Sequence, residues 1–197
     1  MTKHAQKEER RTQILDAAVA CFARKGYYET TMDDIVREAN LSKGTLYWYF
    51  KSKLELFRNL NELWFAEIME SLKQQANPEA NSAARLRMMV EAVKSSAASK
   101  PELVRALLEF YTLALRDAEL KQWLRDAYVS DGKLLRELLK DGIDRGEFRT
   151  FDPAAVARLT MAALDGALLH RELFEAESSG SPTLDEVADT LIALLEK

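Results

Sequence analysis

The chain has 197 residues, of which 47% are hydrophobic and 30% are charged, and its formal net charge is −4. This composition is typical of a soluble globular protein, and the absence of an apolar run of about 18 residues excludes a membrane-spanning helix. The single cysteine, Cys21, cannot form an internal disulfide, and the N-terminal segment lacks the apolar stretch of a secretory signal. We therefore expect a cytoplasmic protein.

The net charge hides an asymmetry along the chain. Residues 1–53 carry 10 basic and 7 acidic side chains, whereas residues 54–197 carry 18 and 25. A basic head on an acidic body suggests that the head meets a polyanion such as DNA. Chance segregation of charge would give the same pattern.

Helical periodicity covers nearly the whole chain, and no stretch shows the alternation of a strand. An apolar face over residues 12–25 stops at Gly26, a typical helix terminator. Thr31 and Asp34 then have the spacing of a capping box. Similar helix-start signals, first-turn prolines and breaks follow at Ser52–Glu55, Ser99–Glu102, Pro101, Gly146, Pro153, Glu177–Pro182 and Thr183–Glu186. The pattern predicts an all-α fold of about nine helices.

The stretch LSKGTLYWYF, residues 41–50, is dense in aromatic residues. Leu46 and Phe50 share the inward face of the helix predicted here, because residues four apart lie on one side. Gly44 and Trp48 then lie at the centre of the outward face. The aromatic residues on that face are therefore available to a partner.

The first turn of this helix contains Lys43, where free amide donors and the positive helix end favour an anion. A helix over residues 32–39 precedes it after a tight turn. Two short helices joined in this way are typical of a helix-turn-helix that reads DNA. A plain helical hairpin, with its aromatic side chains packed on another helix, is the alternative.

The segment TTMDDIVREANLSKGTLYWYFKSKLELF, residues 30–57, strongly resembles the DNA-binding region of the TetR family of bacterial transcriptional regulators. The similarity extends upstream, so it covers about the first third of the chain. It implies phosphate contacts at the starts of two helices, base contacts from the first turn of the recognition helix, and a tyrosine against the sugar–phosphate backbone. Trp48 and Tyr49 depart from the commonest family residues, and Trp48 is suited to thymine methyls or sugars. The implied DNA-binding residues are Thr31, Ser42, Lys43, Gly44, Thr45, Tyr47, Trp48, Tyr49 and Lys53.

We expect a domain boundary at Lys53. Residues 1–53 would form a three-helix DNA-binding domain, and residues 54–197 a larger helical regulatory and dimerisation domain. The resemblance implies that the helix after Pro153 and the last helix pair with their copies in a homodimer. Small residues and an apolar stripe support close helix approach, although packing within one subunit is the alternative. The candidate interface residues are Ala162, Gly166, Leu169, Leu184 and Leu191.

The body also contains aromatic residues and methionines suited to an adaptable cavity. Each of them is individually more often plain core, but the resemblance implies a ligand cavity here. Because carboxylates outnumber bases nearby, we expect a small apolar effector that is neutral or cationic. The candidate ligand-binding residues are Trp64, Met88, Met89, Glu109, Phe110, Tyr111, Trp123, Tyr128, Met161 and Asp165.

No catalytic constellation, phosphate loop or metal-ligand spacing occurs in the sequence, and we expect no cofactor. The prediction is a homodimeric repressor that a small molecule releases from a palindromic double-stranded DNA operator. An activator or a protein-controlled regulator of the same fold is the nearer alternative. A helical small-molecule enzyme or carrier is the more distant one.

Overall fold

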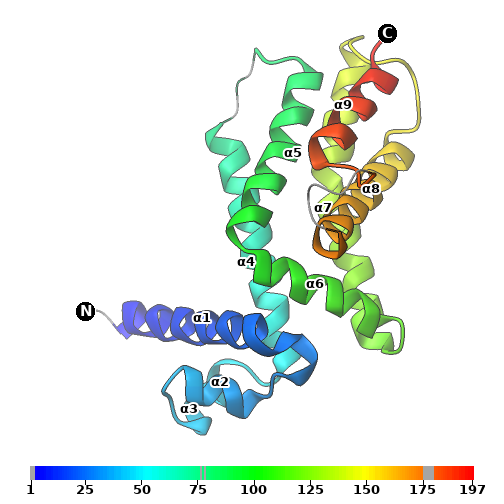
Figure 1. The fold of residues 1–197 in the computed structure, drawn as a ribbon. Helices are drawn as coiled ribbons and strands as arrows, with labels where there is room; N and C mark the ends of the chain where they lie inside the picture. The colour runs from blue at the N-terminus through cyan, green and yellow to red at the C-terminus, as the bar shows by residue number, and fades with distance from the viewer. Residues whose placement is uncertain (1–2, 76, 78, 175–179) are drawn as a thin grey trace. The chain divides into compact units, whose positions relative to one another are not determined.

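The computed structural model describes residues 3–75, 77, 79–174 and 180–197, and most of these residues lie in nine α-helices (Figure 1). The chain forms two compact units: unit 1 contains residues 1–66 and 100–116, and unit 2 contains residues 67–99 and 117–197. In the described ranges no strand forms, and one isolated bridge pairs Phe148 with Glu196. The predicted all-α fold is confirmed. No helix in these ranges is both long enough and apolar enough to span a bilayer.

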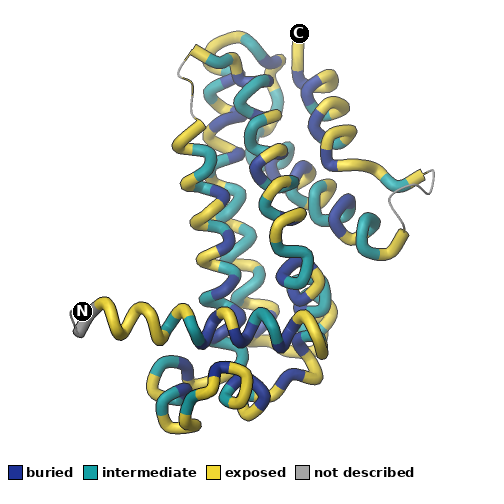
Figure 2. The backbone as a smooth tube through the Cα atoms, turned by 60° about the vertical axis from the view of Figure 1, so that its left-hand side comes forward, coloured by how far each residue is buried: buried dark blue, intermediate teal, exposed yellow. Residues whose placement is uncertain are grey.

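Unit 1 is built on α1 (Lys3–Glu29), against which α2 (Met32–Glu38) and α6 (Pro101–Ala114) both pack. The short α3 (Lys43–Tyr49) follows α2, and the first turns of α4 (Lys53–Gln74) complete the unit. Figure 2 shows buried and exposed positions alternating along these helices, as amphipathic helices require.

Aromatic rings form the centre of unit 1. The rings of Phe57 and Phe110 are fully buried and stacked, with centroids 4.3 Å apart. Tyr27 stands edge-on to both, and Phe22 packs against Tyr27 at 5.4 Å. Edge-to-face and offset pairs of this kind each contribute about 0.5–1.5 kcal/mol beyond the burial of their area. This ring cluster makes α6 part of unit 1, although α5 intervenes in the sequence.

The division of function expected at Lys53 stays a prediction. Unit 1 takes in the chain up to residue 66 and adds α6, so the two compact units interleave along the sequence. Hydrophobic periodicity identifies α6 as a buried helix without indicating which neighbours bury it.

Unit 2 contains α5 (Ser82–Ser99), α7 (Ala118–Asp144), α8 (Pro153–Leu173) and α9 (Leu184–Leu195), together with the last turns of α4. Both α7 and α9 pack against α5 and also against α8. The core between these helices is apolar and consists of Ala83, Leu86, Leu135, Leu138, Leu139, Phe148, Ala157, Ile192 and Leu195.

Most of the predicted helix boundaries are confirmed. Thr31 and Thr183 each form a capping box, and the Ser52 hydroxyl accepts the amide hydrogen of the third helical residue of α4 at 3.1 Å. Gly26 interrupts α1 with a φ of 75°, and Gly146 follows α7 with a φ of 73°. Of the break expected at residues 177–182, residues 177–179 lie outside the described residues.

The cap predicted at Ser99 is wrong. Helix α5 runs through Ser99, whose hydroxyl donates to the Ser96 carbonyl at 2.8 Å. Helix α6 then starts at Pro101 without a side-chain cap. Proline in the first helical position has its φ preset and lacks the amide hydrogen that a cap would satisfy, so this start does not need the serine.

Candidate nucleic-acid interface and regulatory sites

The α2–α3 pair is held in shape by hydrogen bonds at its helix starts. The Thr31 hydroxyl accepts the Asp34 amide hydrogen at 3.1 Å, and the Asp34 carboxylate accepts the Thr31 amide hydrogen at 3.0 Å. Asn40 turns the chain between the helices with a φ of 51°. The Ser42 hydroxyl then caps α3 by accepting the Thr45 amide hydrogen at 3.1 Å. The two seven-residue helices and their tight turn form the helix-turn-helix predicted from the sequence.

The two faces of α3 differ as predicted. Leu46 and Phe50 are buried, with 0% and 2% of their surfaces exposed. Trp48 is 61% exposed on the other side, and Lys43 and Gly44 are exposed as well. A Cβ added to Gly44 would have only the Ser42 hydroxyl within 4 Å, at 3.9 Å, so another backbone can approach closely there. The outward face of α3 is therefore aromatic, basic and open.

Lys43 is paired with an acidic neighbour. Its ammonium lies 2.8 Å from the Asp33 carboxylate, and both side chains are exposed. The hydrogen bond to Asp33 and the attraction of its charge raise the pKa of Lys43, so the lysine stays charged. An exposed pair of this kind is screened by solvent and contributes little to stability. A phosphate or a guanine edge can therefore replace Asp33 as the partner at low cost.

The exposed ring of Trp48 also lies close to a positive charge. The Lys7 ammonium of α1 lies 5.4 Å from the Trp48 ring centroid, and the Tyr49 ring meets Trp48 edge-on at 4.7 Å. This places a second lysine beside the outward face of α3. Lys7 is not among the DNA-binding residues predicted from the sequence, and the basic residues of that N-terminal segment are the signal that could have identified it.

Lys53, at the start of α4, uses its ammonium within the chain. It donates to the carbonyls of Tyr27 and Thr30, both at 2.6 Å, and of Tyr28 at 2.9 Å. Partial burial lowers the pKa of Lys53. An ammonium has three N–H donors, and these three carbonyls accept all of them. The phosphate contact expected for Lys53 stays a prediction.

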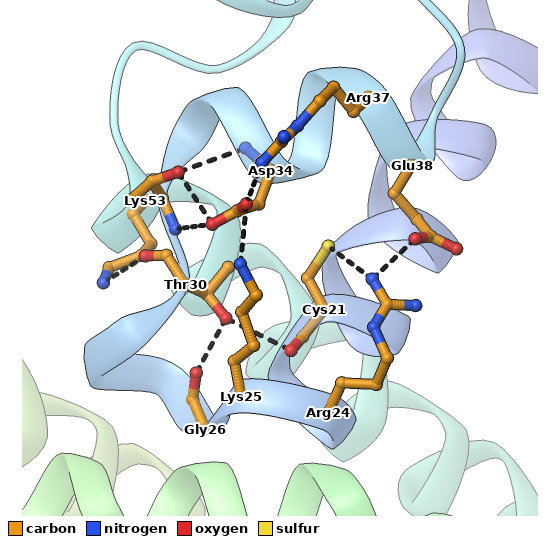
Figure 3. A network of polar contacts seen from close by, with 10 residues as sticks. Cys21, Arg24, Lys25, Gly26, Thr30, Asp34, Arg37, Glu38 and Lys53 are labelled. Atoms are coloured by element: carbon orange, nitrogen blue, oxygen red, sulfur yellow. Dashed lines mark hydrogen bonds and ion pairs between the residues drawn. The ribbon is translucent and has the colours of Figure 1, made fainter.

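A buried carboxylate joins α1 to α2 (Figure 3). Asp34 accepts hydrogen bonds from Lys25 at 2.8 Å, from Arg37, and from Thr31. These hydrogen bonds hold the pKa of Asp34 well below its usual range, and the bond from Lys25 has the largest effect. Cys21 lies nearby and is fully buried, as expected for a core thiol, and desolvation raises its pKa.

The ten candidate ligand-binding residues fall into both units. Trp64, Glu109, Phe110 and Tyr111 belong to unit 1. There Phe110 is a core ring, and the Glu109 carboxylate accepts the Tyr27 amide hydrogen at 2.6 Å. The other six belong to unit 2, namely Met88, Met89, Trp123, Tyr128, Met161 and Asp165. A ligand role for any of the ten stays a prediction.

Unit 2 contains an apolar groove of 470 Å³. Met88 and Met89 line it, as the sequence analysis expected of ligand contacts. Lys73 and Arg85 also border the groove, and Arg85 is paired with Asp141 at 2.5 Å. The remaining lining residues are Met69, Leu72, Asn77, Leu134 and Leu138.

A second group in unit 2 joins α7 to α8. The Tyr128 hydroxyl is hydrogen-bonded to Asp165. Burial is the main cause that raises the pKa of Tyr128, and the charge of Asp165 raises it further. Burial raises the pKa of Asp131 to about 6, and the nearby Asp165 carboxylate adds to this shift. Met161 approaches the same helix, because its sulfur lies 2.9 Å from where a Cβ on Gly132 would stand. Asp131 is not among the residues predicted from the sequence, although its three-residue spacing from Tyr128 places it on the same face of α7.

The candidate dimer residues of α8 lie on or beside an exposed apolar face. Ala162 is exposed, Leu169 is 39% exposed, and a Cβ on Gly166 would meet no atom within 4 Å. In α9, Leu184 is buried within the chain and Leu191 is half-buried. Other large apolar side chains on these two helices are strongly exposed, namely Leu159, Leu173 and Leu194 at 69%, 64% and 57%. The packing of a second subunit against this face remains a prediction.

Two family models match the chain. The model of bacterial regulatory proteins of the tetR family matches residues 14–60, and that of the C-terminal region of BetI-type transcriptional repressors matches residues 82–196. The uncharacterized HTH-type transcriptional regulator YfiR of Bacillus subtilis is 31% identical over 183 residues, covering 92% of this chain and 89% of that protein. The fatty acid metabolism regulator protein of the same species is 26% identical, covering 73% of each chain.

Solved structures share the fold. A putative transcriptional regulator from Saccharomonospora viridis in complex with choline has a TM-score of 0.77 at 20% identity, covering 96% of this chain and 100% of that one. The fatty acid degradation regulator FadR from Bacillus halodurans has a TM-score of 0.78 at 22% identity, covering 93% and 94%. With its helix-turn-helix and both family matches, this chain belongs to the TetR family of bacterial transcriptional regulators.

Proposed function

We propose that the protein is a homodimeric repressor that binds a palindromic operator through α3 and leaves it when a small molecule binds. The observation that carries this proposal is the outward face of α3, where exposed Lys43, Gly44 and Trp48 stand on a helix fixed from behind by buried Leu46 and Phe50. Rigid presentation of a few side chains to base edges is what sequence readout in the major groove requires.

The exposed face of α8 and α9 supports the dimer. Leu159, Leu191 and Leu194 border a hollow of 560 Å³ on this face. Large apolar side chains that gather on one exposed surface are typical of a protein interface. Pairing two copies there would give the complex two α3 helices. A palindrome with half-sites about 34 Å apart would receive them in successive major grooves.

For the effector, we propose a small apolar molecule that is neutral or cationic. The groove of unit 2 offers thioethers and leucines to an apolar molecule. Tyr128, Asp131 and Asp165, on α7 and α8 of the same unit, are a separate set of oxygen atoms that would favour a cationic group. The Saccharomonospora regulator, which shares this fold, holds the cation choline. Such a ligand gains mostly from area removed from water, about 25 cal/mol per Å² before ordering costs.

A fatty acid is the second candidate effector. Lys73 and Arg85 border the same apolar groove, so a carboxylate head group would find positive charge beside a channel for its chain. The name of the Bacillus subtilis fatty acid regulator points in the same direction. Arg85 already has a carboxylate partner in Asp141, which weakens its attraction for a second one.

Three ligands of equal chain length separate these candidates: a quaternary ammonium, an alcohol and a fatty acid. We expect the first two to change the fluorescence of Trp123, which is half-buried in unit 2, and to release operator DNA. Asp165→Asn should weaken binding of the quaternary ammonium but not of the other two ligands. Lys73→Ala should leave binding of the quaternary ammonium unchanged. Tight binding of the fatty acid alone, lost in Lys73→Ala, would establish the second candidate.

A further inference from the structure

The kink near the end of α1, where the turn toward α2 begins, depends on a glycine. Gly26 has a φ of 75°, a conformation that glycine adopts without strain. The chain then passes through Tyr27 and Thr30 before α2 begins at Met32. Because α2 and α3 follow directly, the path of this turn sets the direction in which the helix-turn-helix leaves α1.

A side chain from α6 occupies the space beside this glycine. A Cβ on Gly26 would lie 2.6 Å from one carboxylate oxygen of Glu109 and 2.8 Å from the other. The second oxygen accepts the Tyr27 amide hydrogen at 2.6 Å. Glu109 therefore accepts the hydrogen bond of a backbone donor in the turn, although the two residues are 82 positions apart in the sequence. Hydrogen bonds to a charged acceptor are about twice as strong as neutral ones.

The backbone carbonyls of the same turn are bound by a positive charge, the ammonium of Lys53. Lys53 donates to the carbonyls of Tyr27 and Thr30, and its ammonium lies 4.6 Å from the Tyr27 ring centroid. The Tyr27 ring also packs edge-on against Phe57 and Phe110, each at 5.2 Å. Tyr27 is thus fixed through its amide, its carbonyl and its ring, and Glu109 supplies the amide contact.

We propose that Glu109 is a positioning residue for DNA recognition: its carboxylate fixes the Gly26–Tyr27 turn and so holds α2 and α3 in the direction that the operator requires. The inference rests on DNA binding through α3. Without an acceptor for the Tyr27 amide the turn gains alternative conformations, and operator binding has to select one of them at a cost in affinity. The cost appears as weaker binding, although Glu109 itself touches no DNA.

Three substitutions at one position test the role of the carboxylate. Glu109→Ala removes the acceptor, Glu109→Asp retracts it by one methylene, and Glu109→Gln keeps an acceptor oxygen at the same reach. Glu102→Gln, in the first turn of the same helix, is the matched control. Operator affinity and its salt dependence are measured on the full chain at a temperature where circular dichroism shows every variant folded. Hydrogen exchange of residues 26–30 reports on the turn.

We expect Glu109→Ala and Glu109→Asp to lower operator affinity roughly tenfold. Exchange in residues 26–30 should accelerate, and the salt slope should stay that of the wild type, since no phosphate contact is lost. Glu109→Gln should retain most of the affinity, and Glu102→Gln all of it. If Glu109→Ala does not fold, the difference in operator affinity between Glu109→Asp and Glu109→Gln tests the proposal.

Wild-type affinity in Glu109→Asp, or equal losses in Asp and Gln, would overturn the proposal. A changed salt slope would do so as well, because it would indicate direct contact with phosphate. Failure of DNA binding itself is distinguished by the wild-type protein, which would then bind no operator. Faster exchange at residues 26–30 would still report the contact of Glu109 with the turn.

Discussion

Lys43 and Lys53 both carry a positive charge near the recognition helix, but their ammonium groups have different surroundings. Lys43 is exposed and paired with Asp33, whereas Lys53 is half-buried on three carbonyls. We expect Lys43→Ala to weaken operator binding while helix content stays the same, as loss of a contact to a base edge requires. Tyr47→Ala should weaken binding while helix content stays the same. Titrations at four salt concentrations measure both effects.

For Lys53→Ala two mechanisms make different predictions. A phosphate contact would reduce the salt slope by about one unit and lower affinity for all sequences alike. Because the three donors of Lys53 are already used by carbonyls, we expect lower thermal stability and weaker binding at an unchanged slope. A reduced slope at wild-type stability would show that the sequence-based phosphate assignment is right and this expectation wrong.

Asp131 makes stability depend on pH. Its pKa is raised from 3.8 to about 6, so between these values the folded chain holds the proton more tightly than the unfolded chain. The free energy of unfolding therefore falls as the pH rises through this window, and the loss is complete above it. Asp131→Asn removes this penalty, so its stability gain should grow from pH 4 to pH 6 and then level off.

Urea unfolding at several pH values measures the gain, and Asp126→Asn, at an exposed position on the same helix, is the control. A stability gain in Asp131→Asn that does not change with pH would contradict the raised pKa of this carboxylate.

At the scale of elements, helix starts and faces could be predicted because their signals are local. Capping boxes span four residues, and the inward side of α3 follows from the spacing of Leu46 and Phe50. The partner of Glu109 could not be predicted in this way. A carboxylate on the apolar α6 needs a partner, but only the fold brings the Tyr27 amide to it. The same limit applies to Asp131, whose burial depends on how α8 packs against α7.

The α8 helix also offers a direct test of the dimer. A Cβ on Gly166 meets no atom of its own chain within 4 Å, so Gly166→Leu should leave the fold of one subunit intact. If a second copy packs on this face, the larger side chain overpacks the interface and releases monomers. Sedimentation should then show a shift from dimer to monomer, with Ala98→Leu, at an exposed position of α5, as control. An undisturbed dimer would place the interface elsewhere.

For the whole molecule, the distribution of charge agrees with the division of function that remains a prediction. The first 53 residues are net basic and contain α2 and α3, while the rest of the chain is net acidic. An acidic body avoids nonspecific contact with DNA, so the operator is met through the basic head. If the proposed effector releases the operator, it must bind one conformation better than another, and operator affinity would fall by that difference.

The proposal that α3 reads a specific DNA sequence can be tested by selection from a random DNA library with the full chain. We expect enrichment of a palindrome whose half-sites are centred about 34 Å apart. Binding of this site should weaken about 5- to 150-fold in Lys43→Ala, as a specific contact worth about 1–3 kcal/mol requires. A library in which no sequence is enriched would contradict the claim, as would an enriched site that wild type and variant bind equally.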